Sequence, residues 1–337
     1  MANLYPEAMT NTPTIGIVII GRNEGERLVG CLNSLDASAA PVVYVDSGST
    51  DGSIAMAKSR GIEVVELVMN RPFTAARARN AGFSRLLELH PSTKLVQFVD
   101  GDCLVADGWL EFAADYLETN SKIAIVCGRR KEIHPEHSIY NQLCDAEWNS
   151  PIGESDACGG DFMVVATAFT EVEGFNDGLI AGEEPELCFR LRQKGWRIYR
   201  ADILMTHHDA AMTEFGQWLR RTARSGYAYA ARAAVHRHVP GGFCRRENLR
   251  ILFWAAALPM IVLMGSTLVS SWFALLLLAY PIQYLRLWRW VKQSNPEAPA
   301  ARYAFFLVLG KWPEFGGQMM FLSRWLRGAE QTLIEYK

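Results

Sequence analysis

The stretch IGIVIIGRNEGERLVGCLNSL (residues 15–35) decides the fold of this chain. A run of apolar, mostly β-branched residues at 15–20 predicts a buried strand, and the polar and glycine residues after it predict a turn. The amphipathic run at 27–35 then predicts a helix. A strand, a short polar turn and a helix form the βα unit from which parallel sheets are built.

The same pattern repeats along the following part of the chain. Further strands are expected at 42–46, 64–67 and 95–100, and helices at 53–59 and 74–89. Successive βα units predict an α/β fold with a mostly parallel central sheet. Because such sheets bind ligands beyond the carboxyl ends of their strands, we expect the functional residues in the turns that follow the strands.

Length and composition predict two main parts and argue against a nucleic-acid partner. A chain of 337 residues is longer than one usual compact domain. We expect a tail at 1–13, an α/β domain at 14–235 and a membrane-associated helical region at 236–337. The 34 basic and 36 acidic residues nearly balance, and the seven cysteines show no CxxC pair. Reduced thiols are therefore expected, with neither a zinc site nor a disulfide framework.

The C-terminal region carries the pattern of a membrane hairpin at about 251–285. Its two apolar segments, 251–268 and 272–285, each lie near the lower limit of about 17 residues for crossing a bilayer. Basic residues flank both outer ends but not the turn, which predicts that both ends are cytoplasmic. A buried helical pair of a soluble domain is the alternative. The segment 303–325, which carries charges beside a proline, predicts an interfacial helix.

The N-terminus lacks the features of a cleavable signal peptide. We therefore expect the α/β domain on the cytoplasmic face of the inner membrane.

The strongest chemical signal is the sequence VDGD at residues 99–102. Asp100 and Asp102 follow an apolar strand, and carboxylates this close repel each other unless a cation lies between them. Hard oxygen ligands suit Mg²⁺ or Mn²⁺, and such a metal could also bind a diphosphate leaving group. A solvated turn is the alternative for this motif alone.

Polar turns of the kind that binds nucleotides follow the first two predicted strands. Backbone N–H groups and an aspartate in such turns can hold a nucleotide. Neither turn has the GxGxxG or GxxxxGK[ST] pattern, which disfavours a dinucleotide site and a P-loop. The candidate residues are Arg22, Asn23 and Glu24 in the first turn and Asp46, Ser47 and Asp51 in the second.

Taken together, these motifs resemble those of the family 2 glycosyltransferases of the GT-A fold. The resemblance covers about residues 14–229 and implies a nucleotide-diphosphate sugar as donor, with a UDP-sugar as the first expectation. It also implies a divalent cation at the DxD motif and a single displacement with inversion. It is carried by RNE (22–24), VDSGSTDGS (45–53), ARNAG (78–82), VDGD (99–102), GGD (159–161) and AGEEPELCFRLRQKGW (181–196).

The resemblance implies roles for single residues on the donor side. Asp46 would hold the nucleobase and ribose, Arg79 would face the nucleotide and its phosphates, and Asp102 would bind the metal beside Asp100. Ser47 departs from the pattern, since many relatives have a second aspartate there. The implied donor site comprises Arg22, Asn23, Glu24, Asp46, Ser47, Asp51, Arg79 and Asp100.

The resemblance also implies a catalytic base in the sequence GEEPEL at 182–187. Relatives have an aspartate where this chain has Glu184, so Glu184 is the base candidate. The additional methylene leaves Glu183 as a rival. The alternative for these acids is a charged first turn that stabilises a helix through its dipole.

A third metal ligand and an acceptor site complete the expectations. Two histidines follow a short strand predicted at 198–204, and in many GT-A enzymes such a histidine completes the metal coordination. We favour His208 over His207, with a hydrogen-bonded histidine pair as the alternative. A basic helix on anionic lipid would explain the residues near 218–224 equally well. The candidate acceptor-binding residues are Gly159, Gly160, Asp161, Trp218 and Arg221.

The sequence thus predicts a membrane-attached, metal-dependent, inverting glycosyltransferase. Membrane attachment points to a lipid-linked oligosaccharide or a growing cell-envelope polysaccharide as acceptor. Two alternatives remain open: a sugar nucleotidyltransferase, which also needs paired carboxylates and Mg²⁺, and a non-catalytic subunit that binds sugar nucleotides in a membrane synthase complex.

Overall fold

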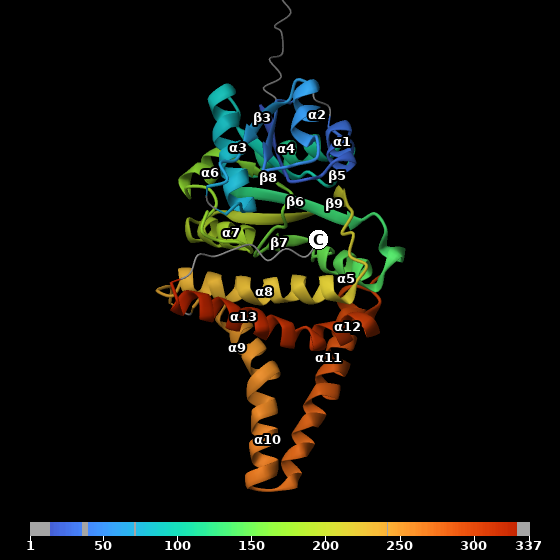
Figure 1. Ribbon diagram of the computed structural model, residues 1–337. Coiled ribbons are helices and arrows are strands. Elements are labelled where there is room, and N and C mark those ends of the chain that lie inside the picture. The colour runs from blue at the N-terminus through green and yellow to red at the C-terminus, as the bar shows by residue number, and fades with distance from the viewer. Residues whose placement is uncertain (1–13, 36–39, 71, 241, 329–337) are drawn as a thin grey trace, which may run out of the picture.

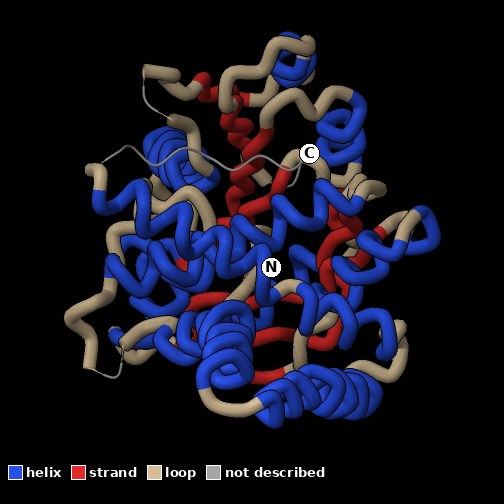
Figure 2. Tube along the Cα trace, turned by 60° about the horizontal axis from the view of Figure 1, so that its bottom comes forward, coloured by secondary structure: helices blue, strands red, loops and turns tan. Residues whose placement is uncertain are grey.

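The computed structural model describes residues 14–35, 40–70, 72–240 and 242–328, so the tail predicted at 1–13 lies outside the described residues. An α/β part lies above a layer of two long helices, α8 and α13, from which a helical hairpin projects away from the sheet (Figure 1). Figure 2, which brings the hairpin end forward, shows helices covering that end with the strands behind them.

The N-terminal half of the sheet is parallel, which confirms the predicted α/β class. Its strand order is β3-β2-β1-β4, and the three helices α1, α2 and α3 connect these strands in chain order. The register pairs Ile20 with Asp100 and Gly21 with Asp46, so the carboxyl ends of these strands are level. The bounds are β1 Ile15–Gly21, α1 Glu26–Asn33, β2 Val42–Asp46, α2 Ser53–Ser59, β3 Glu63–Glu66, α3 Ala75–Leu89 and β4 Leu95–Asp100.

Helix α3 packs very closely on the sheet because of one glycine. A Cβ atom at Gly82 would lie 2.3 Å from Cγ1 of Val18 and 2.8 Å from Cγ2 of Val45. A larger residue would therefore push α3 away from β1 and β2. This close packing fixes the position of the residues at the start of α3, among them Arg79.

Beyond β4 the sheet is mixed. The order continues β8-β6-β9-β5, with β7 on β9, and β8 runs antiparallel to both β4 and β6. The bounds are β5 Cys103–Val105, α4 Trp109–Thr119, β6 Ile123–Glu132, η1 Pro135–His137, α5 Ile139–Trp148, β7 Gly153–Ser155, β8 Phe162–Val165, α6 Ala166–Glu171, α7 Glu183–Gln193 and β9 Arg197–His208.

Strand β9 is longer than the strand predicted at 198–204. It continues to His208 because its last residues pair with β5 on one side and with β6 on the other. The end of the strand was not predicted because its sequence is polar, and sequence patterns detect strands by their apolar residues.

Helices α8 (Phe215–Val235) and α13 (Lys311–Leu326) cross in close contact. A Cβ atom at Gly226 would lie 1.9 Å from the carbonyl oxygen of Glu314, and one at Gly317 would lie 1.9 Å from that of Ala223. Glycines allow helix backbones to approach in this way. The position of α8 above the site is therefore tied to α13.

The hairpin has one arm from Arg245 to Leu268 and a second from Ser271 to Ser294. The first arm contains a π-helical turn just before Pro259, which has no N–H group to continue the helical hydrogen bonds. The hydroxyl of Tyr280 donates to the carbonyl of Trp254 at 2.6 Å and joins the arms. The bounds are α9 Arg245–Leu252, η2 Phe253–Ala257, α10 Leu258–Leu268, η3 Ser271–Leu278 and α11 Ala279–Ser294.

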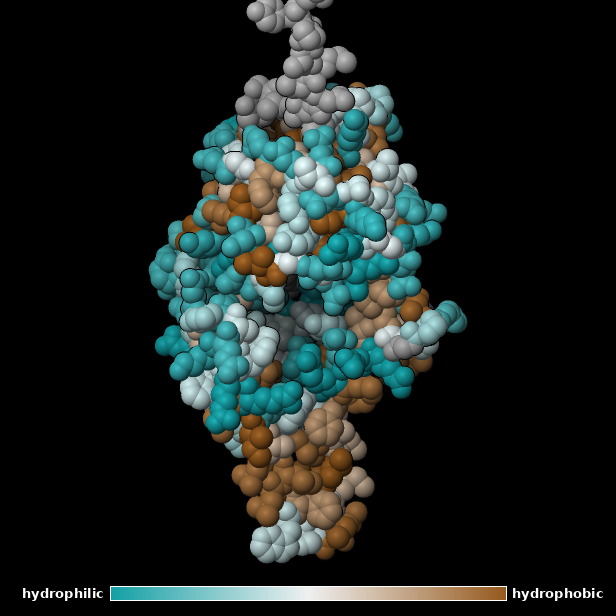
Figure 3. All heavy atoms as spheres, turned by 180° about the vertical axis from the view of Figure 1, so that it is seen from behind, coloured by the Kyte–Doolittle hydropathy of each residue, from teal (hydrophilic) through white to brown (hydrophobic). Residues whose placement is uncertain are grey.

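The surface of the hairpin is strongly apolar, whereas most of the visible surface above it is hydrophilic (Figure 3). Within the described residues, the helix Arg245–Leu268 is the one that is long and apolar enough to cross a membrane. The helix expected at 303–325 is instead two helices, α12 (Ala300–Leu309) and α13. The break lies at Gly310, because the chain turns there to lay α13 along α8.

Candidate active site

A cleft lies between the carboxyl edge of the sheet and helix α8. It has a large lobe of about 540 Å³ and a small lobe of about 270 Å³. Glu183, Glu184 and Arg232 line the large lobe, and Arg22, Asp102 and His208 line the small lobe. The two lobes adjoin, since both are lined by Ala75, Asp100, Arg130, Trp148, Arg221 and Arg224.

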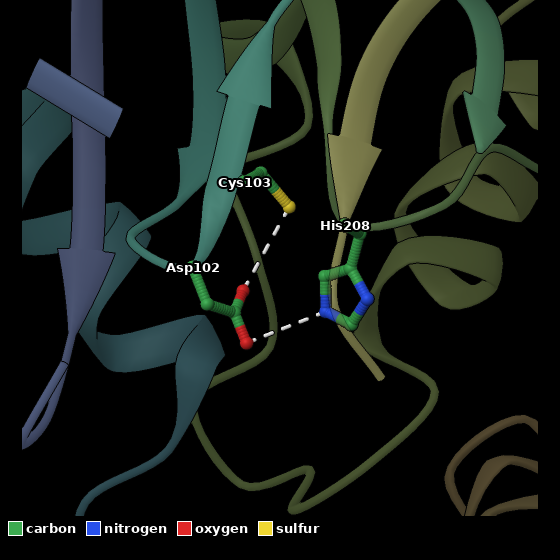
Figure 4. A group of neighbouring side chains, drawn as sticks. All are labelled: Asp102, Cys103 and His208. Carbon is green, nitrogen blue, oxygen red and sulfur yellow. Dashed lines mark hydrogen bonds and ion pairs between the residues drawn. The ribbon is translucent and has the colours of Figure 1, made fainter. Parts of the chain in front are cut away.

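Asp102 and His208 face each other in the small lobe (Figure 4). Oδ2 of Asp102 lies 3.3 Å from Nε2 of His208, and both side chains are buried. They meet because β5 pairs with β9 in a register that places Cys103 opposite His208. His207 precedes His208 in the strand, so its side chain points to the other face of the sheet.

The side chains of Asp102 and His208 are suitable ligands for Mn²⁺ or Mg²⁺. A carboxylate and an imidazole are acceptable ligands for Mn²⁺, and the carboxylate suits Mg²⁺. Cys103 lies beside them, with Sγ 3.7 Å from Oδ1 of Asp102, but burial raises the pKa of its thiol well above the usual value. The thiol therefore stays neutral and is a poor ligand for a hard cation. The edge of the Trp148 ring packs on His208, with 4.7 Å between ring centres.

Asp100 is held differently from Asp102. Its carboxylate accepts from Nη2 of Arg79 at 2.8 Å and from Nη2 of Arg130 at 3.0 Å. Although burial opposes the charge, these two guanidinium groups hold the pKa of Asp100 below its usual value. The structure thus places Asp102 and His208 together and joins Asp100 to two arginines.

Arg79 connects three elements of the cleft. Its guanidinium is almost fully buried and contacts Asp100 at the end of β4. Nη1 donates to Oε1 of Glu183 at 3.0 Å and to Oε1 of Glu184 at 3.3 Å, both at the start of α7. A buried charge needs such partners, because an unpaired one costs several kcal/mol. Arg79 therefore fixes both glutamates relative to Asp100.

The pKa of Glu184 is raised by its surroundings. Burial and the neighbouring charge of Glu183 raise the pKa of Glu184 to about 7, although Arg79 opposes the rise. A general base works best when its pKa lies near the operating pH. The third acid of the run, Glu186, is different, since it pairs with Arg190 and His236 and stabilises the helix.

The two polar turns predicted to bind a nucleotide are tied to each other. Asp46 is buried and accepts from the backbone N–H groups of Gly48 at 2.9 Å and Ser49 at 2.7 Å. Oδ1 of Asn23 accepts from the N–H of Thr50 at 2.7 Å, and Asp51 accepts from the N–H of Ser53 at 3.1 Å. These three side chains shape the turns. Arg22, Glu24 and Ser47 line the small lobe itself.

The predicted acceptor residues separate into two groups. Gly159, Gly160 and Arg221 line the large lobe. A Cβ atom at Gly160 would lie 2.7 Å from Oδ2 of Asp100, so only glycine fits there. Asp161 is fully buried behind the cleft, and Trp218 lines neither lobe.

Asp161 and Trp218 have structural contacts. Asp161 accepts from the N–H of Asp100 at 3.0 Å and from Nε of Arg130 at 2.9 Å. Trp218 packs against Phe215 and Phe306, with ring centres 5.4 and 4.8 Å away.

Arg130 and Arg232 of the cleft were not predicted from the sequence. Arg130 lies in the strand β6, where a charged residue beside an apolar run is a signal of a buried function. Arg232 lines the cleft from α8, as the predicted Arg221 does. Arg232 follows Arg221 by about three helical turns, so the helical period could have placed both on one face of the helix.

The chain is similar in sequence to known glycosyltransferases. Residues 16–159 match the family model described as "Glycosyl transferase family 2". The chain is 25% identical over 65% of its length to "Glycosyltransferase AglE" of Haloferax volcanii, covering 74% of that protein. It is 24% identical over 91% of its length to "Succinoglycan biosynthesis protein ExoA" of Rhizobium meliloti, covering 94% of it. A "Pre-mycofactocin glycosyltransferase" of Mycobacterium tuberculosis is 25% identical over 70% of the chain, which covers 51% of that protein.

A solved structure shares the fold. It is the "Mannosyltransferase PcManGT from Pyrobaculum calidifontis in complex with GDP-Man and Mn2+", with a TM-score of 0.63 and 13% identity. The similarity covers 93% of this chain and 88% of that one. Over residues 16–159 the chain is similar to glycosyl transferase family 2, and this match together with the named relatives identifies it as a glycosyltransferase.

Proposed function

We propose that this glycosyltransferase is metal-dependent and inverting, and that it transfers a sugar from a nucleotide diphosphate to an acceptor hydroxyl at a membrane. One observation carries the proposal. The pair Asp102–His208 and the glutamates held by Arg79 open into one cleft, and Asp100 lines both of its lobes. Metal ligands and a base are therefore available to one bound donor and acceptor.

The small lobe is the proposed donor site. The turns after β1 and β2 border it, and Arg22, Glu24 and Ser47 line it. Asp102 and His208 would hold the divalent cation, which when bound supplies positive charge for the departing diphosphate. PcManGT was solved with GDP-Man and Mn²⁺, which supports a nucleotide sugar and this metal. The sequence favours a UDP-sugar, so both nucleotides belong in the donor tests.

The large lobe is the proposed acceptor site. Glu184 would take the proton of the acceptor hydroxyl, and Glu183 remains the rival. Attack from this lobe, opposite to the leaving diphosphate, inverts the anomeric carbon. Asp161 is buried, so we assign it to the positioning of Asp100 and not to the acceptor. Trp218 is assigned to the packing of α8.

The hairpin is the proposed membrane anchor, with the cleft on the cytoplasmic face of the inner membrane. The helix Arg245–Leu268 has the required length and composition, and many apolar side chains of the hairpin are exposed. Basic residues at the outer ends of both arms support a cytoplasmic α/β part. An acceptor bound to a lipid, or a growing glycan at the membrane, agrees with this arrangement.

A single-turnover assay tests this function and separates it from its alternatives. The full-length protein in detergent is given radiolabelled UDP- or GDP-sugars, Mn²⁺ and a membrane lipid extract. Transfer of the label to lipid or glycan supports the proposal. Exchange of pyrophosphate into the donor would indicate a nucleotidyltransferase, and nucleotide binding without either reaction would indicate a non-catalytic subunit.

A further inference from the structure

Arg232 is a buried cation in the large lobe for which the described part of the protein supplies no carboxylate partner. Arg232 is 7% exposed, and its Nε donates to the carbonyl of Ala228 in the same helix at 3.2 Å. Its guanidinium also packs on the rings of Tyr229 and Phe243, at 4.9 and 5.8 Å. Buried charges are normally paired, because an isolated one is costly.

Two other arginines of the cleft behave differently. Arg79 contacts three carboxylates, and Arg130 contacts Asp100 and Asp161. Arg232 lines the same cleft, and no carboxylate among the described residues contacts it. Its charge is therefore available to an anion that enters the lobe.

The position of Arg232 separates this anion from the diphosphate of the donor. Arg232 lines the large lobe and not the small lobe, where Asp102 and His208 lie. A Cβ atom at Gly182 would lie only 3.0 Å from Nε of Arg232. An anion on Arg232 thus lies next to the start of α7, on the side of Glu183 and Glu184.

The place of α8 in the molecule indicates where this anion comes from. Arg232 lies on α8, which packs along α13. Both α13 and the hairpin carry exposed apolar side chains, and the hairpin projects from this layer away from the sheet (Figure 1). The phosphate of a lipid lies at the boundary between its apolar chain and water, which is the level of this layer.

We propose that Arg232 binds a phosphate or diphosphate group in the head of a lipid acceptor. The planar guanidinium, with its several N–H donors, matches phosphate oxygens. The lipid chain would lie beside the hairpin, and its phosphate head would reach the proposed base Glu184 from the side of α8. This inference rests on the proposed function and adds the chemical class of the acceptor.

The test measures ligand binding to the full-length protein in detergent. The probes are farnesyl phosphate, farnesol, inorganic phosphate, and UDP or GDP with Mn²⁺. The variants are Arg232→Gln, Arg232→Lys and, as matched control, Arg237→Gln, which changes an exposed arginine just beyond α8. We expect Arg232→Gln to weaken farnesyl phosphate binding at least tenfold, and Arg232→Lys to weaken it less. Arg237→Gln should change it less than twofold, and nucleotide binding should stay within twofold in all variants.

Each of the next three outcomes overturns the inference in a distinct way. Farnesol bound as tightly as farnesyl phosphate would show that the phosphate is not recognised. Inorganic phosphate bound as tightly as farnesyl phosphate would exclude a lipid source. Equal losses of nucleotide and farnesyl phosphate binding in Arg232→Gln would place Arg232 in the donor site. If the wild-type protein binds neither nucleotide with Mn²⁺, the proposed function fails instead, independently of Arg232.

Discussion

Replacement of Glu184 by glutamine removes the charge of the proposed base and keeps its shape. Burial and Glu183 raise the pKa of Glu184 from the ordinary value of 4.5 to about 7. The difference corresponds to roughly 3 kcal/mol of cost for the ionised carboxylate, as an upper value. Between these two pKa values the folded protein holds a proton that the unfolded chain releases. Glu184 therefore lowers the stability of the wild-type protein as pH rises through this window.

The Glu184→Gln variant should consequently be inactive but more stable. Loss of a general base costs about 10²–10⁴-fold in turnover. At pH 8 the melting temperature should exceed that of the wild type by several degrees, and the difference should shrink toward pH 5. Binding of nucleotide with Mn²⁺ should not change, because Glu184 lines only the large lobe.

The measurements are initial rates of labelled sugar transfer and melting curves at pH 5 and pH 8, with Glu183→Gln in parallel. Normal turnover by Glu184→Gln would refute the base assignment, and loss of turnover in Glu183→Gln alone would transfer the role to Glu183. A Glu184→Gln protein that is less stable than the wild type at pH 8 would refute the electrostatic reasoning. It would mean that Arg79 stabilises the carboxylate by more than burial costs it.

Three further predictions concern the metal, the nucleotide turn and the helix crossing. Asp102→Asn should abolish the Mn²⁺-dependent thermal shift with UDP or GDP, and a shift of wild-type size would contradict the metal assignment. Asp46→Ala should lower the free energy of unfolding by about 1–3 kcal/mol in chemical denaturation, because it removes the oxygen that accepts from both N–H groups of the turn; an unchanged value would contradict this. Gly226→Ala should expose the α8–α13 pair to limited proteolysis, because the methyl group meets the backbone of Glu314. Gly216→Ala in the same helix meets no atom closer than 3.6 Å and is the control, so identical digestion of the two variants would refute the crossing.

The parallel half of the fold could be predicted because its strands are buried on both faces. The strand at 15–20 is then a run without polar side chains, the strand at 95–100 is largely apolar, and the helix predicted at 53–59 matches α2. The mixed half of the sheet was harder to predict from the sequence. Strand β9 ends in polar residues up to His208, and its length depends on pairing with β5 and β6, which local sequence does not reveal.

In the candidate site, too, residues in local sequence patterns could be predicted, whereas contacts between distant parts of the chain could not. Asp100 and Asp102 were found because a DxD at the end of a strand is a local pattern. The contacts of Asp100 were not predictable, since Arg79 and Arg130 reach it from distant parts of the chain. Trp218 was expected near the acceptor, but its ring lies in an apolar cluster that only the packing of α8 reveals. Arg232 could be identified only from its burial together with the lack of a carboxylate partner among the described residues.

The central claim is that a divalent cation at Asp102 and His208 is required for sugar transfer. The most direct test is the rate of transfer by the full-length protein after treatment with a strong chelator, followed by titration with Mn²⁺. We predict that transfer is lost in the chelator and returns saturably with Mn²⁺. An undiminished rate in the chelator would contradict the claim.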